Sequence, residues 1–274
     1  MPVSRHVATA ALAFAGLALG LAAPAAAQTR VDGDPYAADP SGIVDDPCPV
    51  HPAPADGDAW RIANLHMLTR DFGQHCRYRA QNAALRAART RVDVVFMGDS
   101  ITDGWIAADP SLFTGGVVDR GISGQTTPQM LVRFREDVIE LHPRAVHILA
   151  GANDIAGNTG ASTMAVVQGN IRSMAELARA HGIRVILGSI LPAGAFPWSP
   201  DKKPAPQIIE FNRWLRGYAA ANGFAFVDYH AALADAQGAM RPGLAGDGVH
   251  PNAAGYALMR PLALAAIRRT LGAR

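Results

Sequence analysis

From residue 92 onward, short runs of β-branched and apolar residues alternate with amphipathic segments in which apolar residues recur every three or four positions. Strands that alternate with helices in this way predict a doubly wound α/β fold with a mainly parallel, five-stranded sheet. The expected strands are VDVVFMG (92–98), GGVVDRGI (115–122), AVHILAGA (145–152), RVILGSI (184–190) and FAFVDYH (224–230), and the expected helices are PQMLVRFREDVIEL (128–141), STMAVVQGNIRSMAELARAHG (162–182) and PQIIEFNRWLRGYAAANG (206–223).

The segment ahead of the first strand divides into two parts. Residues 60–89 keep the helical period, so one or two helices are expected there. Residues 28–57 are rich in Pro, Asp, Gly and Ala without either period, which indicates an extended arm. We therefore expect one domain over 58–274 with a helical lead-in over 58–90.

The first 27 residues have the parts of a secretory signal peptide. Arg5 lies in a short n-region, residues 8–23 form an Ala-rich apolar stretch, and Ala25-Ala26-Ala27 offers a cleavage site. The alternative is an uncleaved membrane anchor, for which the stretch is short. No later segment approaches about 20 apolar residues, so we expect an exported protein, periplasmic or extracellular, with no membrane span after cleavage.

Composition narrows the classes of partner. The chain is 49% apolar and 18% charged, which is typical of a globular domain with a sizeable core. Its net charge of +2 is spread without a basic stripe, which argues against a nucleic-acid partner. No nucleotide-binding glycine fingerprint follows an expected strand, so we expect no cofactor.

Cys48 and Cys76 are the two cysteines of the chain. In an oxidising compartment we expect them to form a disulfide, which would stabilise the fold by about 3 to 4 kcal/mol in the chain-entropy model. A zinc pair is the weaker alternative, because a tetrahedral site needs further Cys or His ligands at suitable spacing. We therefore expect no metal site.

Loops at the carboxyl ends of three expected strands carry groups suited to acyl transfer, and ligands of open α/β sheets bind at that edge. Ser100 in GDSIT (98–102) could present its hydroxyl and its backbone N–H to one crevice. Gly124 in RGISGQTT (120–127) could turn a backbone N–H toward a ligand, and Asn153 in ILAGANDIAG (148–157) could donate its amide. Taken singly, each stretch is equally typical of an ordinary turn.

A fourth stretch, GDGVHPNAAGY (246–256), is more specific. It places Asp247 and His250 three residues apart in a Gly-rich loop ahead of an expected helix. The carboxylate could hold one imidazole nitrogen and leave the other free to take a proton. The alternative is a surface histidine at the start of a helix.

Together and in this order, the four stretches resemble the blocks of the SGNH hydrolases, also called the GDSL esterase and lipase family. The resemblance covers about residues 91–270 and implies a flavodoxin-like, three-layer α/β/α sandwich that hydrolyses acyl esters. It implies that Ser100 is the nucleophile, that His250 is the general base and then acid, and that Asp247 orients His250. It also implies an oxyanion hole formed by the N–H groups of Ser100 and Gly124 and by the amide of Asn153. Ala152 stands where many members have a glycine.

The substrate is less defined by the sequence. Trp105 follows the serine, and Phe196 and Trp198 lie in a Pro-rich loop over 191–206, so these three aromatic residues are candidates for the wall of the pocket. A small-residue frame favours a short-chain esterase acting on a small-molecule or glycan ester, with acetylated carbohydrates as one option. The alternatives are a lysophospholipase or thioesterase, and a non-catalytic carbohydrate-binding protein on the same fold.

Overall fold

The structure is a computed structural model that describes residues 42–48 and 59–272. The signal peptide expected over 1–27 and most of the arm expected over 28–57 lie outside the described residues. No helix within the described ranges is long and apolar enough to cross a membrane.

The five expected strands form one sheet in the order β2-β1-β3-β4-β5, and every neighbouring pair is parallel. This is the strand order of flavodoxin-like folds, so the predicted fold class is confirmed. The strands are β1 (Val94–Gly98), β2 (Val117–Gly121), β3 (Ala145–Leu149), β4 (Arg184–Gly188) and β5 (Ala225–Val227).

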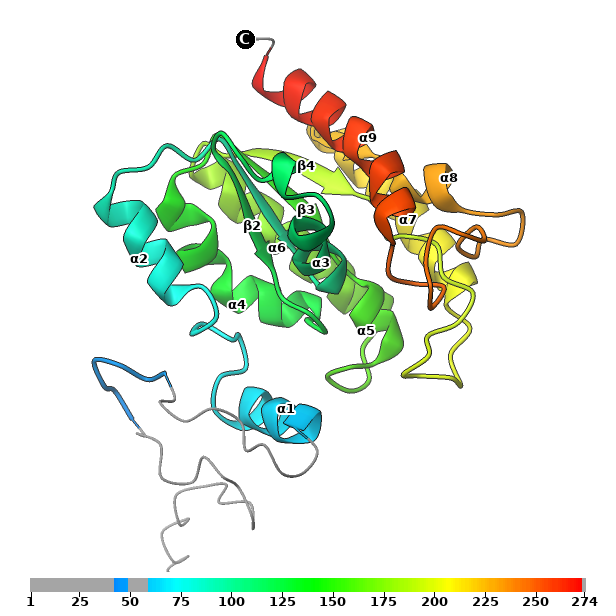
Figure 1. Ribbon diagram of the computed structural model, residues 1–274, viewed down its shortest axis with the longest axis horizontal. Helices are drawn as coiled ribbons and strands as arrows, with labels where there is room; N and C mark the ends of the chain where they lie inside the picture. The colour runs from blue at the N-terminus through cyan, green and yellow to red at the C-terminus, as the bar shows by residue number, and fades with distance from the viewer. Residues whose placement is uncertain (1–41, 49–58, 273–274) are drawn as a thin grey trace, which may run out of the picture.

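Helices cover both faces of this sheet (Figure 1). Among the described residues two helices precede β1, in agreement with the one or two helices expected over residues 60–89, and one helix or more lies between each pair of successive strands. The helices are α1 (Ala59–Thr69), α2 (Arg79–Ala87), α3 (Ser100–Ala108), α4 (Thr127–Asp137), α5 (Ala152–Ala156), α6 (Met164–Ala180), α7 (Pro204–Asn222), α8 (Tyr229–Leu233) and α9 (Ala253–Leu271), with 3-10 turns at Pro110–Leu112 and Ile139–Leu141.

The core is divided by the sheet into two apolar layers. Val95 and Met97 of β1 point into a layer shared with α4, α6 and α7, whereas Val94 and Phe96 point into a layer shared with α3, α8 and α9. Successive strand residues face opposite sides, and all five residues of β1 are buried. This explains why the strand appears in the sequence as a continuous apolar run.

The register of the central strands brings their carboxyl ends level. Gly98 at the end of β1 pairs with Gly121 of β2 on one side and with Leu149 of β3 on the other. The loops after these three strands therefore meet at one point on the edge of the sheet, which is where parallel sheets place their ligands.

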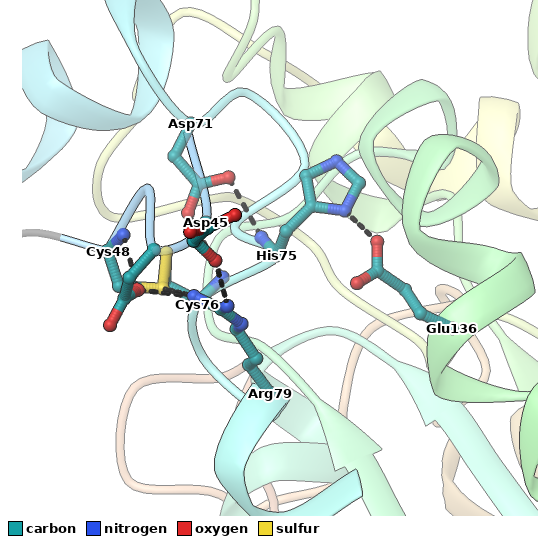
Figure 2. The surroundings of a disulfide bond; sticks show 8 residues. Asp45, Cys48, Asp71, His75, Cys76, Arg79 and Glu136 are labelled. Atoms are coloured by element: carbon teal, nitrogen blue, oxygen red, sulfur yellow. Dashed lines mark hydrogen bonds and ion pairs between the residues drawn. A yellow bond between two sulfur atoms is a disulfide. The ribbon is translucent and has the colours of Figure 1, made fainter. Parts of the chain in front are cut away.

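The expected disulfide is present and joins Cys48 to Cys76 (Figure 2). It attaches residues 42–48 to the connection between α1 and α2. Arg79 at the start of α2 strengthens the attachment, since its guanidinium donates to the Asp45 carbonyl at 2.6 Å and pairs with the Asp46 carboxylate. The weaker alternative of a zinc-binding pair is therefore wrong.

Candidate active site

Ser100 is the first residue of α3 and lies directly beyond the end of β1. The Asp99 side chain caps the helix by accepting the Ile101 N–H at 3.0 Å. Gly98, the last residue of β1, must be a glycine for steric reasons, because a Cβ there would lie 2.0 Å from Thr102 Oγ1 and 2.9 Å from the Leu149 carbonyl oxygen. The tight packing of β1 against α3 thus fixes the serine at the edge of the sheet.

The loop before α9 brings a histidine to this serine across 150 residues of chain. Ser100 Oγ lies 2.9 Å from His250 Nε2, and His250 Nδ1 lies 2.6 Å from Asp247 Oδ2. The other carboxylate oxygen, Asp247 Oδ1, accepts the backbone N–H groups of Val249 at 2.9 Å and His250 at 2.8 Å. The carboxylate is therefore held locally. When it accepts a hydrogen bond from the Nδ1–H of His250, the other ring nitrogen, Nε2, is left unprotonated and faces the serine.

Two aspartates near the serine have opposite electrostatic environments. Complete burial raises the pKa of Asp99 to about 6, against the lowering effect of the Ile101 N–H hydrogen bond. Partial burial would also raise the pKa of Asp247, but its hydrogen bonds from the His250 ring and from two backbone N–H groups outweigh burial and lower that pKa. Asp247 is therefore the carboxylate suited to pair with a protonated imidazole, while Asp99 serves as the helix cap.

Gly124 and Asn153 flank the serine from the loops after β2 and β3. Gly124 has φ +80°, a left-handed conformation that favours glycine, and no neighbouring atom approaches its Cβ position within 3.4 Å. Asn153 lies in the first turn of α5, and its Nδ2 donates to the Gln125 carbonyl at 3.0 Å. The next residue, Asp154, ties the two loops together by accepting the Thr127 N–H at 2.9 Å.

The serine, the histidine and the two flanking residues line one cavity of about 840 Å³. Four of the five residues expected for the chemistry line it, and Asp247 lies behind His250. The full lining is Ser100, Asp103, Gly104, Ala107, Ala108, Ser123, Gly124, Asn153, Asn158, Trp198, His250, Pro251 and Tyr256.

Asp103 and Asn158 are among the polar residues of this lining that the sequence did not single out. Asp103 accepts both the backbone N–H and the hydroxyl of Ser123, at 3.2 and 2.7 Å, and pairs with Arg77. Helical spacing could have identified Asp103, because positions 100, 103, 104, 107 and 108 share one face of α3. Asn158 lies in an irregular turn, where no periodic signal exists.

The prediction that Trp105 and Phe196 line the pocket is wrong. Trp105 is on the opposite side of α3 from the serine, fully buried, and its ring stacks on Tyr256 at 5.4 Å between centroids. Phe196 is also fully buried, because the turn that returns from Phe196 to Ser199 directs it into the core. Trp198 does line the cavity: it is 42% exposed, with its ring centroid 5.6 Å from that of His250.

A parallel sheet in the order 2-1-3-4-5, with a hydroxyl, an imidazole and a carboxylate in line at its carboxyl edge, defines the class of SGNH hydrolases. Sequence comparison supplies the family. The profile of the GDSL-like lipase/acylhydrolase family matches residues 96–258, more than half of the chain. The chain belongs to this family and is a carboxylic ester hydrolase.

Individual relatives agree with this assignment. The crystal structure of a GDSL-like lipase from Bacteroides thetaiotaomicron is 48% identical, with a TM-score of 0.69, and the match covers 72% of this chain and 98% of that chain. An acetylxylan esterase from Geobacillus stearothermophilus is 26% identical over 61% of this chain and 89% of its own length. A Bacillus subtilis lipoprotein is 31% identical over 36% of this chain, a match that spans about half of that protein's length (49%).

Proposed function

We propose that Ser100, His250 and Asp247 form a catalytic triad that hydrolyses short-chain acyl esters by way of an acyl-enzyme. The observation that carries the proposal is the chain of two hydrogen bonds, 2.9 Å from Ser100 Oγ to His250 Nε2 and 2.6 Å from His250 Nδ1 to Asp247 Oδ2. In that chain, His250 accepts the serine proton as the hydroxyl attacks the ester carbonyl, and it then protonates the leaving alcohol. Water activated by the same imidazole releases the acid.

The negative charge that develops on the carbonyl oxygen needs donors near the serine. We assign this role to the backbone N–H groups of Ser100 and Gly124 and to the side-chain amide of Asn153. Ser100 lies in the first turn of α3, where helix N–H groups have no partner within the helix. One such donor is typically worth a factor of 100 to 1000 in kcat, or about 3 to 4 kcal/mol.

For the substrate, we propose acetyl-type esters of carbohydrates. The cavity of about 840 Å³ is far larger than an acetyl group, so it has room for a bulky alcohol. A half-exposed indole can pack against a sugar ring, and the Asp103 carboxylate can accept sugar hydroxyls. The similarity to an acetylxylan esterase supports this choice.

We further propose that the protein is exported. A disulfide between Cys48 and Cys76 is typical of an oxidising compartment, and a lipoprotein is among the relatives. The segment expected to direct export, residues 1–27, would be removed on secretion.

The test is a panel of p-nitrophenyl esters from acetyl to palmitoyl, together with acetylated xylo-oligosaccharides, assayed with the wild type, Ser100→Ala and the matched control Ser162→Ala on an exposed loop. We expect turnover to be highest on acetyl esters, to be lost in Ser100→Ala and to be unchanged in the control. A fluorophosphonate probe should label the wild type but not Ser100→Ala, whereas a binding module would not be labelled. Retained turnover in Ser100→Ala contradicts the triad, and a preference for long acyl chains contradicts the proposed substrate.

A further inference from the structure

We infer that Asn158, which is not a member of the proposed triad, is a positioning residue that sets the geometry of the oxyanion hole and joins it to the Trp198 wall. The inference rests on the proposed function. Asn158 lies in the turn after α5, is half-buried and lines the cavity. Its backbone N–H donates to the Asn153 carbonyl at 3.1 Å, so the turn holds it beside the proposed oxyanion donor.

The side chain of Asn158 contacts three groups at the site. Its Nδ2 donates to the Gly124 carbonyl at 3.0 Å and to Asn153 Oδ1 at 3.0 Å. Its Oδ1 accepts the indole N–H of Trp198 at 3.0 Å. Both N–H bonds of the amide and one acceptor position of its oxygen are therefore occupied, and the amide has one favourable orientation.

This network determines which way the Asn153 amide faces. Asn153 Nδ2 donates to the Gln125 carbonyl, and Asn153 Oδ1 accepts from Asn158. If the Asn153 amide were reversed, its oxygen would face the Gln125 carbonyl and its nitrogen would face the Asn158 nitrogen. Only the observed orientation leaves the second N–H of Asn153 for a substrate oxyanion. Asn158 supplies one of the two hydrogen bonds that favour this orientation.

The same amide links the oxyanion loops to the exposed wall of the cavity. Trp198 stacks on the buried ring of Phe196 at 5.1 Å between centroids, which fixes the indole in place. Its N–H in turn fixes Asn158 Oδ1, and Asn158 Nδ2 holds the carbonyl of Gly124. The wall and two of the proposed oxyanion donors therefore form one hydrogen-bonded unit.

The test compares Asn158→Asp with Asn153→Ala, the double variant and Asn222→Asp. The last is a matched control at the end of α7, where the amide donates only to the Tyr218 carbonyl at 2.9 Å. An aspartate at 158 cannot donate to Gly124 or Asn153 and places a negative charge beside both oxygens. We expect kcat on p-nitrophenyl acetate to fall about 100-fold, as for the loss of an oxyanion donor, with KM within about threefold of wild type.

Two further readouts separate positioning from a general structural effect. In the double variant, the fold-loss in kcat should be much smaller than the product of the fold-losses in the two single variants, because Asn158 acts largely through Asn153. Trp198→Phe keeps an aromatic ring, although a smaller one, and removes the indole N–H, so kcat should fall only about three- to tenfold. This variant also serves if Asn158→Asp does not fold.

The inference is overturned if Asn158→Asp keeps kcat within threefold of wild type, if it raises only KM, or if its loss multiplies with that of Asn153→Ala. Should Asn158→Asp fail to fold, an unchanged kcat in Trp198→Phe overturns it. Failure of the proposed function is a different result, in which Ser100→Ala retains turnover.

Discussion

Replacing Asp247 by asparagine tests the proposed triad most directly, because it preserves shape while changing one hydrogen-bond polarity. Asp247 Oδ1 accepts two backbone N–H groups, at 2.9 and 2.8 Å, so the oxygen of an asparagine amide would stay on that side. The NH₂ group would then face His250 Nδ1. An imidazole whose Nδ1 accepts a hydrogen bond carries its proton on Nε2. In that tautomer Nε2 cannot take the proton of the serine.

The magnitude follows from the cost of avoiding this arrangement. Reversing the amide would sacrifice two backbone hydrogen bonds, about 2 kcal/mol in all, which leaves the productive tautomer disfavoured by about 30-fold. The corresponding change in buried triads costs about 10⁴ in kcat. Since the Asp247 side chain is 39% exposed and water can replace part of its role, we expect a loss between these two values.

The assay is kcat and KM on p-nitrophenyl acetate at neutral pH, with Asp201→Asn on an exposed loop as the matched control. We expect kcat to carry the whole loss and the control to match wild type. A change of less than threefold in kcat would refute the reasoning, because it would mean that the Asp247–His250 contact does not control the proton.

Three further changes have defined outcomes. Cys48→Ser with Cys76→Ser removes a crosslink across 28 residues and should lower the free energy of unfolding by about 3 to 4 kcal/mol in urea; an unchanged midpoint contradicts this. Burial raises the pKa of Asp119 to about 7. Between about pH 4 and pH 7 the carboxyl of the folded protein therefore keeps a proton that the unfolded chain has lost, so the free energy of unfolding falls as the pH rises through this range. Asp119→Asn should remove that slope and be more stable than wild type at pH 8 but not at pH 4, as measured by urea midpoints. Trp198→Ala should reduce kcat/KM about tenfold more on acetylated oligosaccharides than on p-nitrophenyl acetate, and equal losses would argue against a sugar platform.

The residues just before Cys76 contact the proposed oxyanion loop. Gln125 Nε2 donates to the Gly73 carbonyl and to Gln74 Oε1, both at 3.0 Å, and these two residues immediately precede the segment that carries Cys76. The Gln125 carbonyl in turn accepts from Asn153. The lead-in before β1 therefore packs directly against the loops of the site, which no periodicity in the sequence indicated.

Local patterns were sufficient for the sheet and for placing the proposed reacting groups at its carboxyl edge. The continuous apolar run of β1 is the signature of a strand buried on both faces, and a parallel sheet places the ends of such strands at one edge. Asp247 and His250 lie three residues apart, so their pairing depends mainly on one loop. These features depend on neighbours in the chain, which is why the sequence alone determined them.

The wall of the cavity was decided by the tertiary structure. Trp105 and Trp198 are both aromatic residues near predicted site loops, yet one is fully buried and the other is 42% exposed. The difference depends on which side of α3 packs against α9 and on the turn at Phe196, and neither is a property of adjacent residues. Asn158 likewise gains its role only when loops after β2, β3 and β4 meet, because a side-chain amide acquires direction from its partners and not from its place in the sequence.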